Sequence, residues 1–482
     1  MKPTNLLFIL SDQHNATIAG CYGNSMVQTP HIDALAEQGT RFDCAYTPSP
    51  ICVPARASLA TGRYVHDIGY WDNATPYDGR VPGWGHRLKE QGYRVDSIGK
   101  LHFRSADDDN GFVTSHDALY VVDGVGDILS AIRDDAPFRN SRPGIESAGP
   151  GDSTYLQYDA RIADQAGRWL AEHNDDERPW VLFVSFVLPH PPYIAPQNLY
   201  DRYLSQELPF PCQWRYEDWP QHPTIDYMRR FFSFDRPFPE ETIHRLMAAY
   251  YGMCTYLDEQ IGKVLEALTV SGLRANTRII YTSDHGEHLG GRGIFGKFSM
   301  YDESARIPLI IAGPEVAAYN VVKTPVSLTD CYPTILEAVG CPMGKRDTDL
   351  PGQSLWNIAN SEDANRVVLS EYHALGTTQA SFMLRDQRYK YIHHVDAVAQ
   401  LFDMEADPDE LIDLGQDPEQ QVLCQSFEEQ LHVMLDPEET NAKAKADQAA
   451  QIQEHGGREA VIVRGYFQNS PVPGEKPRFS NG

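Results

Sequence analysis

The stretch NLLFILSDQH, residues 5–14, decides the fold class of this chain. Leu6–Leu10 is continuously apolar, and an unbroken apolar run is typical of a parallel strand that is buried on both faces of a sheet. Polar residues then follow directly at the carboxyl end of this strand. Because ligands in open α/β sheets bind outside the carboxyl ends of the strands, the stretch predicts both a buried sheet and a site at its edge.

The same succession of an apolar run and polar residues recurs along the chain. Further strands are predicted at Tyr93–Ile98, Trp180–Leu188, Arg278–Thr282 and Ile307–Ala312. Helices are predicted at His31–Gln38, Leu156–Glu172, Glu241–Leu268 and Leu328–Val339. This alternation indicates an α/β fold with a large mixed, mostly parallel sheet sandwiched by helices. The polar residues expected to converge at the strand ends are Asp12, His102, His190 and Asp284.

The character of the sequence changes near Asn360–Asn365. Three strands of a small antiparallel sheet are predicted beyond it, at Val367–Glu371, Gln379–Leu384 and Arg388–His393. We therefore expect a catalytic α/β domain at residues 1–362 and a C-terminal α+β subdomain with a tail at residues 363–482. Residues from about Asp417 to His455 are predicted to be helical, and the tail after Gly456 to be extended or in contact with another subunit.

The composition excludes several classes of protein. With 41 Lys and Arg against 67 Asp and Glu, the net charge of −26 disfavours binding to nucleic acid or to acidic membranes. The longest apolar stretch, Trp180–Leu188, is about half of the ~20 residues that span a bilayer, and no secretory signal is visible. Eight irregularly spaced cysteines without a CxxC pair fit a reducing, cytoplasmic setting. The aromatic-rich Tyr200–Phe238 stretch and the long tail favour a homo-oligomer, a dimer or tetramer.

The most informative motif is CVPARASLATGRY, residues 52–64. Pro54 suits the first turn of a helix and Gly62 its end. Cys52 would then lie at the helix N-terminus, where the dipole favours negative charge, with Arg56 four residues on along the same face. Taken alone, such a cysteine is most often simply buried. The full pattern C-x-P-x-R followed by A-S-L-x-T-G-R, however, resembles the signature of the sulfatase family within the alkaline-phosphatase superfamily.

This resemblance extends from Asn5 to about Asp413 and implies an alkaline-phosphatase-like fold with hydrolase activity. In the family, a formylglycine-generating enzyme converts the cysteine to formylglycine, whose hydrated aldehyde is the nucleophile. Its second hydroxyl can expel the bound anion, whereas a thiol or serine would leave a stable ester. Ala55 stands where the family more often has serine, which weakens the maturation signal slightly. The implied partners are the maturation enzyme and a small anionic ester.

Two dipeptides, Asp12-Gln13 and Asp284-His285, resemble the metal-binding pairs of the family. Taken alone, a carboxylate after a strand is more often a turn or cap residue. Together with modified Cys52, the pairs supply five ligands for one divalent cation. Many relatives have Asp-Asp and Asp-Asn at these places. The amide and the imidazole make this site less anionic and softer, which shifts the preference from Ca²⁺ towards Mn²⁺.

The remaining motifs resemble the substrate-binding residues of the family. In the family's G-K-x-H segment, the lysine, at the position of Lys100, binds the anionic ester, and the histidine, at the position of His102, acts as a base. His190, in P-H-P-P-Y, resembles the histidine that faces the leaving-group oxygen, and Lys297, in G-K-F-S-M-Y-D-E, the lysine that contacts the ester. In isolation, the histidine reads equally well as a turn residue and the lysine as a surface charge. Asn73 either reaches the substrate or stabilises a turn.

The implied mechanism is an in-line attack by a hydroxyl of modified Cys52, ionised by the metal and Arg56. Lys100 and Lys297 neutralise the transferring group, His190 protonates the departing oxygen, and His102 deprotonates the remaining hydroxyl. We favour hydrolysis of sulfuric esters, an aryl- or alkylsulfatase activity.

Two alternatives stay open. The first is a phosphonate monoester hydrolase or phosphodiesterase with the same machinery, because Asp-Gln with Asp-His is similar to that branch of the superfamily. Trp71–Ala74 with the G-K-x-H segment, by contrast, is similar to choline-sulfatase-like members. The second alternative is a non-catalytic, metal-dependent anion-binding protein in which Cys52 remains unmodified.

Overall fold

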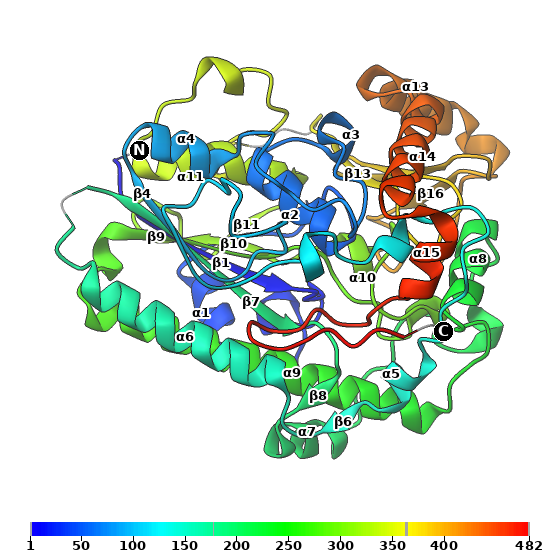
Figure 1. Ribbon diagram of the computed structural model, residues 1–482, viewed down its shortest axis with the longest axis horizontal. Coiled ribbons are helices and arrows are strands. Elements are labelled where there is room, and N and C mark those ends of the chain that lie inside the picture. Colours follow the sequence, from blue (N-terminus) through cyan, green and yellow to red (C-terminus); the bar gives the residue numbers. More distant parts are fainter. Residues whose placement is uncertain (1, 177, 362–364, 481–482) are drawn as a thin grey trace.

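The computed structural model describes residues 2–176, 178–361 and 365–480. At its centre lies a sheet of eight strands with helices on both faces (Figure 1). In spatial order the strands are β11 (Asn320–Val322), β2 (Gly39–Phe42), β10 (Leu309–Ala312), β9 (Thr277–Ser283), β1 (Asn5–Asp12), β7 (Trp180–Pro189), β4 (Arg94–Lys100) and β5 (Thr114–Leu119). β9, β1, β7, β4 and β5 run parallel, and β10 pairs antiparallel with β9 and β2. The predicted mixed, mostly parallel sheet is confirmed.

The unbroken apolar run of β1 has a direct structural reason, because both faces of this strand are covered. Leu7 and Ile9 belong to one core cluster, and Leu6, Phe8 and Leu10 belong to the other. The first core lies beneath α1 (Pro30–Glu37), α6 (Thr154–Glu172), α7 (Gln197–Leu204) and α9 (Glu240–Val270). The second lies beneath α2 (Cys52–Thr61), α4 (Trp84–Glu90) and α11 (Cys331–Val339). These two layers fix the position of the strand ends.

The predicted strands and helices are present, with small differences at their ends. β1 and β4 continue to Asp12 and Lys100, so that their last residues are the polar ones. The helix expected from Leu328 begins as a 3₁₀ turn, Leu328–Asp330, and continues as α11. Shorter helices connect the larger elements: α3 (Val65–Ile68), α5 (Arg142–Glu146), α8 (Pro223–Phe231), α10 (Asp302–Ala305) and α12 (Leu355–Ile358). Two small parallel pairs are β3 (Ala45–Tyr46) with β12 (Val326–Ser327) and β6 (Gly149–Pro150) with β8 (Ile194–Ala195).

The C-terminal region contains the predicted antiparallel sheet, with one strand more than expected. Its strands are β13 (Val368–Tyr372), β14 (Ser381–Arg385), β15 (Tyr389–His394) and β16 (Gln400–Asp403). The expected domain boundary at residues 362–363 falls outside the described residues, and the division of the chain there stays a prediction. The helical stretch before residue 455 is present as α13 (Gln421–Met434) and α14 (Pro437–Glu454).

The expectation of an extended tail is wrong for its first residues. Gly457–Arg464 forms a helix, α15, because it can bury Val461 in the first core. Beyond α15 the chain doubles back, and Tyr466 pairs antiparallel with Ser480. Figure 1 shows this segment in red, returning from α15 towards the sheet. The tail therefore packs on its own chain, and contact with another subunit stays a prediction.

None of the helices formed by the described residues is long and apolar enough to cross a membrane.

Candidate active site

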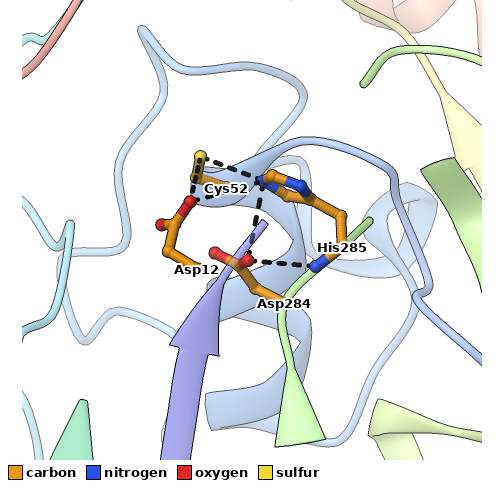
Figure 2. A group of neighbouring side chains, drawn as sticks. All are labelled: Asp12, Cys52, Asp284 and His285. Carbon is orange, nitrogen blue, oxygen red and sulfur yellow. Dashed lines mark hydrogen bonds and ion pairs between the residues drawn. The ribbon is translucent and has the colours of Figure 1, made fainter. Parts of the chain in front are cut away.

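Four side chains meet at the carboxyl edge of the sheet (Figure 2). Asp12 ends β1, Cys52 is the first residue of α2, and Asp284 and His285 follow β9 directly. One potential ligand atom from each residue lies within 4.8 Å of the others, and all four side chains are buried. Because β1 and β9 are parallel neighbours, their polar ends necessarily lie side by side.

The donor atoms of this group are oriented towards one another. Cys52 Sγ lies 3.1 Å from His285 Nε2 and 3.8 Å from Asp12 Oδ1, and His285 Nε2 lies 3.6 Å from Asp284 Oδ1. On the other side of the ring, His285 Nδ1 is 3.1 Å from the carbonyl oxygen of Gly286. That oxygen can only accept, so Nδ1 carries the proton and the lone pair of Nε2 faces the carboxylates. Carboxylate oxygens and an oriented imidazole fit a borderline divalent cation.

Arg56 connects the two carboxylates of the group. Its Nε donates to Asp284 Oδ2 at 2.8 Å and its Nη2 donates to Asp12 Oδ2 at 3.1 Å. Its Nη1 donates to the carbonyl oxygen of Lys100 and to Ser185 Oγ, at 2.8 and 2.9 Å. The guanidinium is only 2% exposed, so its four hydrogen bonds hold β1, β4, β7 and the residue after β9 at fixed positions around the site.

Two buried lysines add positive charge beside Cys52. Lys100 forms an ion pair with Asp12. Lys297 donates to Cys52 Sγ at 3.1 Å and to Gln13 Oε1 at 2.7 Å. The predicted ligand Gln13 thus lies next to the group, with its carboxamide oxygen turned to Lys297 and its backbone N–H donating to Asp284 Oδ1 at 3.1 Å. These cations and the N-terminus of α2 make the position of Cys52 favourable for an anion.

Asn73 contacts the same helix end. Its Oδ1 accepts a hydrogen bond of 3.1 Å from the backbone N–H of Val53, in the first turn of α2. Asn73 also borders the cavity that Lys297 and His102 line. The structure therefore places Asn73 where it stabilises the start of α2, within reach of a bound ligand.

The two predicted proton-transfer histidines follow β4 and β7. His102 Nε2 lies 2.8 Å from Ser470 Oγ, and His190 Nδ1 lies 2.7 Å from the carbonyl oxygen of Pro191. For each ring, burial lowers the pKa first, and nearby cations lower it further, Lys100 for His102 and Lys297 for His190. Both imidazoles are therefore neutral at pH 7 in the ligand-free protein.

The carboxylates of Asp12 and Asp284 differ in pKa because of their burial and their mutual repulsion. Burial alone would raise the pKa of Asp12, but the positive charges of Lys100 and Arg56 hold it well below its usual range. Burial and then the charge of Asp12 raise the pKa of Asp284 to about 6. Two carboxylates this close favour an additional positive charge between them.

A cavity of about 240 Å³ opens in front of Lys297 and His102. The segments 107–151 and 209–239 contribute to its wall, through Val121, Arg139 and Phe232 among others. The C-terminal tail also lines it, from Tyr466 to Ser470. Because these residues reach the site only through the path of the chain after α15, their place was not predictable from the motifs.

Glu287 is a further site residue that the motif analysis did not single out. Its Oε1 accepts backbone hydrogen bonds from Leu289 and Gly296, at 2.8 and 2.6 Å, and its Oε2 accepts from Gln13 Nε2 and from Tyr193 at 2.8 Å. Glu287 thereby positions Gln13 and the loop that carries Lys297. Its place in the D-H-G-E motif, three residues after a metal-binding aspartate, was the available signal.

The chain matches two family models, described as "Sulfatase" over residues 4–341 and as "N-sulphoglucosamine sulphohydrolase, C-terminal" over residues 286–452. It is 32% identical to the choline-sulfatase of Rhizobium meliloti (strain 1021), over 93% of this chain and 90% of that protein. It is 30% identical to the arylsulfatase K of Bos taurus, over 85% of this chain and 78% of that protein.

Among solved structures, the phosphonate monoester hydrolase of Agrobacterium radiobacter has a similar fold, with a TM-score of 0.70 at 22% identity, covering 92% of this chain and 96% of that one. This likeness confirms the alkaline-phosphatase-like architecture. The family match extends over both strand ends, the helix that begins at Cys52 and the Lys297 loop, so the chain belongs to the sulfatase family.

Proposed function

We propose that this protein hydrolyses sulfate monoesters of an alcohol or phenol, with the residue formed from Cys52 as nucleophile. The observation that carries the proposal is the convergence of Cys52, Asp12, Asp284 and His285 within 4.8 Å, together with the direct contact of Lys297 with Cys52 Sγ. The carboxylates can hold a cation at the nucleophile, and the lysines can bind an anionic ester there.

A divalent cation held by Asp12, Asp284, His285, Gln13 and modified Cys52 would supply positive charge at the nucleophile, and a formylglycine hydrate would supply a hydroxyl that can later release the anion. The imidazole and amide donors favour Mn²⁺ over Ca²⁺. The maturation partner is a formylglycine-generating enzyme acting on the motif that starts at Cys52.

The side chains of this chain bind and orient the ester. Lys100 is buried against Asp12 and Lys297 against Cys52, where a charge contact at ~4 Å contributes on the order of 4 kcal/mol at an effective dielectric of 20. This local attraction exceeds the repulsion from the acidic surface, which is screened within ~8 Å. Arg56 holds Asp12 and Asp284 in their ionised, correctly oriented form.

The two histidines move protons. His102, neutral at pH 7, is suited to accept the proton of the remaining hydroxyl after the alcohol has left. His190 Nδ1 donates a hydrogen bond to the carbonyl oxygen of Pro191, which leaves Nε2 as the atom that takes up a proton. The negative charge of a bound sulfate ester raises the pKa of His190 from its low ligand-free value, so that Nε2 can protonate the departing oxygen.

Hydrolysis of phosphonate monoesters or phosphodiesters is the second candidate, supported by the fold-level likeness to phosphonate monoester hydrolases. Both substrates carry one negative charge at the reacting group. A direct comparison of kcat/KM for an aryl sulfate and an aryl phosphonate monoester, on protein with converted Cys52, ranks the two. We expect the sulfate to react faster. A large excess of phosphonate activity would reverse the order, and Cys52→Ala protein purified in the same way measures the background.

A binding protein without turnover is the third candidate, and it requires an unmodified Cys52.

All eight cysteines are free thiols within the described residues, which fits the proposed reducing, cytoplasmic location. The aromatic-rich stretch and the tail support the proposal that the protein forms a dimer or tetramer, and sedimentation analysis tests it.

A further inference from the structure

The wall of the active-site cavity carries a buried ion pair between Arg139 and Asp127. Arg139 Nη1 lies 2.7 Å from Asp127 Oδ2, and the two residues are only 6% and 8% exposed. Both border the same cavity as Lys297 and His102. A charged pair this deep is costly to desolvate, and nothing in the proposed sulfate-binding machinery uses it.

Some polar atoms of these two side chains make no hydrogen bond. Within the described residues, Arg139 Nε and Nη2 make no hydrogen bond, and neither does Asp127 Oδ1. Buried polar atoms are nearly always paired, and leaving one unpaired costs about 1–3 kcal/mol, more for a charged group. A ligand in the cavity that accepted hydrogen bonds from Arg139 Nε and Nη2 would remove the part of that cost that arises from the guanidinium.

The guanidinium is held in place by its surroundings. Its Cζ lies 4.5 Å from the centre of the Tyr466 ring, a stacking contact that arginine favours. The backbone N–H of Arg139 donates to the carbonyl oxygen of Phe231 at 2.7 Å, and Ser233 Oγ donates to the carbonyl oxygen of Arg139 at 3.1 Å. Because Asp127 occupies Nη1, the edge formed by Nε and Nη2 is the one that stays free.

That free edge has a specific chemical complement. Two parallel N–H donors on one side of a planar guanidinium match a carboxylate, which accepts both in a bidentate pair. The surrounding wall is apolar and aromatic, with Phe232, Phe234 and Phe298 among its residues. An aromatic ring with a carboxylate at its far end would satisfy both parts of the wall.

We propose that the leaving group of the natural substrate is a carboxylate-bearing aromatic alcohol or phenol, with its carboxylate bound to the Nε–Nη2 edge of Arg139. This inference rests on the proposed sulfatase function and adds the substrate class to it. A quaternary ammonium alcohol such as choline is a poor fit, because the wall presents a fixed guanidinium, and Asp127, the one carboxylate among the described residues that line the cavity, is already paired with it.

The test compares two sulfate esters that differ only at the far end, 3-(4-sulfooxyphenyl)propanoate and its primary amide. Two methylene groups separate the variable end from the ring, so the two phenol oxygens are nearly equal as leaving groups. On protein with converted Cys52, we expect kcat/KM to be about 10- to 100-fold higher for the carboxylate, the range for a charge-assisted hydrogen-bonded pair. Choline sulfate is measured alongside.

Variants assign the preference to Arg139. Arg139→Met should reduce the carboxylate-to-amide ratio to about one, and Arg139→Lys, which keeps the charge without the planar edge, should give an intermediate ratio. The matched control is Arg142→Met, three residues on. Arg142 donates to the carbonyl oxygen of Arg236 at 2.8 Å and does not border the cavity, so this variant should retain the wild-type ratio. Thermal unfolding checks that each variant is folded.

If Arg139→Met does not fold, titration of the wild-type protein with 3-(4-hydroxyphenyl)propanoate and with its amide gives the same comparison, with tighter binding of the carboxylate expected. Equal rates for both esters, or a preference for the amide or for choline sulfate, would overturn the inference while leaving the sulfatase proposal intact. Failure to hydrolyse any of these sulfates, on protein whose Cys52 is converted and whose metal is bound, would instead refute the proposed function.

Discussion

Replacement of Arg56 tests how the two carboxylates are held together. In Arg56→Met, Asp284 loses its guanidinium partner at 2.8 Å, and Asp12 keeps only its ion pair with Lys100. Breaking a buried ion pair costs about 3–5 kcal/mol. At about 2.1 cal/mol/K per residue, the unfolding entropy of this 482-residue chain is about 1 kcal/mol/K. The melting temperature should therefore fall by about 3–5 °C.

The assay is thermal unfolding in the presence of a chelator and again at saturating Mn²⁺. Because a bound cation replaces the missing positive charge between Asp12 and Asp284, the fall should be smaller with metal than with chelator. Arg63→Met is the control, since Arg63 forms an ion pair with Asp349, whose side chain is 68% exposed, and exposed pairs contribute at most about 1 kcal/mol. An equal fall with metal and with chelator, or no fall in Arg56→Met, would refute the reasoning.

Three further outcomes are expected. His66 Nδ1 pairs with buried Glu371 at 2.8 Å; burial alone would lower the pKa of His66, but Glu371 raises it to about 9. At about 1.4 kcal/mol per pKa unit, the pair stabilises the folded protein by about 3 kcal/mol below pH 6.5, and this contribution is lost as the pH rises through 9. The difference in melting temperature between wild type and His66→Gln should therefore shrink by about 3 °C from pH 6 to pH 10. A constant difference would argue against the pair. Ser470→Ala removes the partner of His102 Nε2 and should lower kcat about 3- to 10-fold with little change in KM, whereas an unchanged kcat would make that contact incidental. Asp284→Asn should weaken Mn²⁺ binding at least 10-fold in a metal titration, and undiminished affinity would place the metal elsewhere.

The strand ends of the site were predictable because local pattern and topology agree there. Leu6–Leu10 is apolar on both faces, as a central strand covered by two layers requires, and Ile279 and Ile280 in the strand before Asp284 likewise face the two cores. Parallel neighbours end at the same edge of a sheet, so Asp12 and Asp284 had to meet. The helix that begins at Cys52 was equally clear, since Gly62 ends it in the left-handed conformation that glycine favours.

The cavity wall was not predictable in the same way. Arg139, Asp127 and Ser470 lie in irregular segments without periodicity, and Ser470 joins the other two in the cavity wall because the chain folds back after α15. β16 was missed because four residues are too few for a period-two pattern to stand out. Helix α15 was missed because the flanking glycines suggested a loop, whereas the burial of Val461 stabilises a helix.

The identity of the nucleophile is tested most directly by mass spectrometry of the tryptic peptide that spans residues 42–56, from protein expressed with a formylglycine-generating enzyme and assayed beforehand for aryl sulfate hydrolysis. This peptide contains Cys44 as well as Cys52, so Cys44 is an internal standard for complete alkylation under denaturing conditions. We predict one alkylated thiol, at Cys44, and an aldehyde that reacts with a hydrazide at position 52. Two alkylated thiols in a preparation that hydrolyses the ester at full rate would contradict the account.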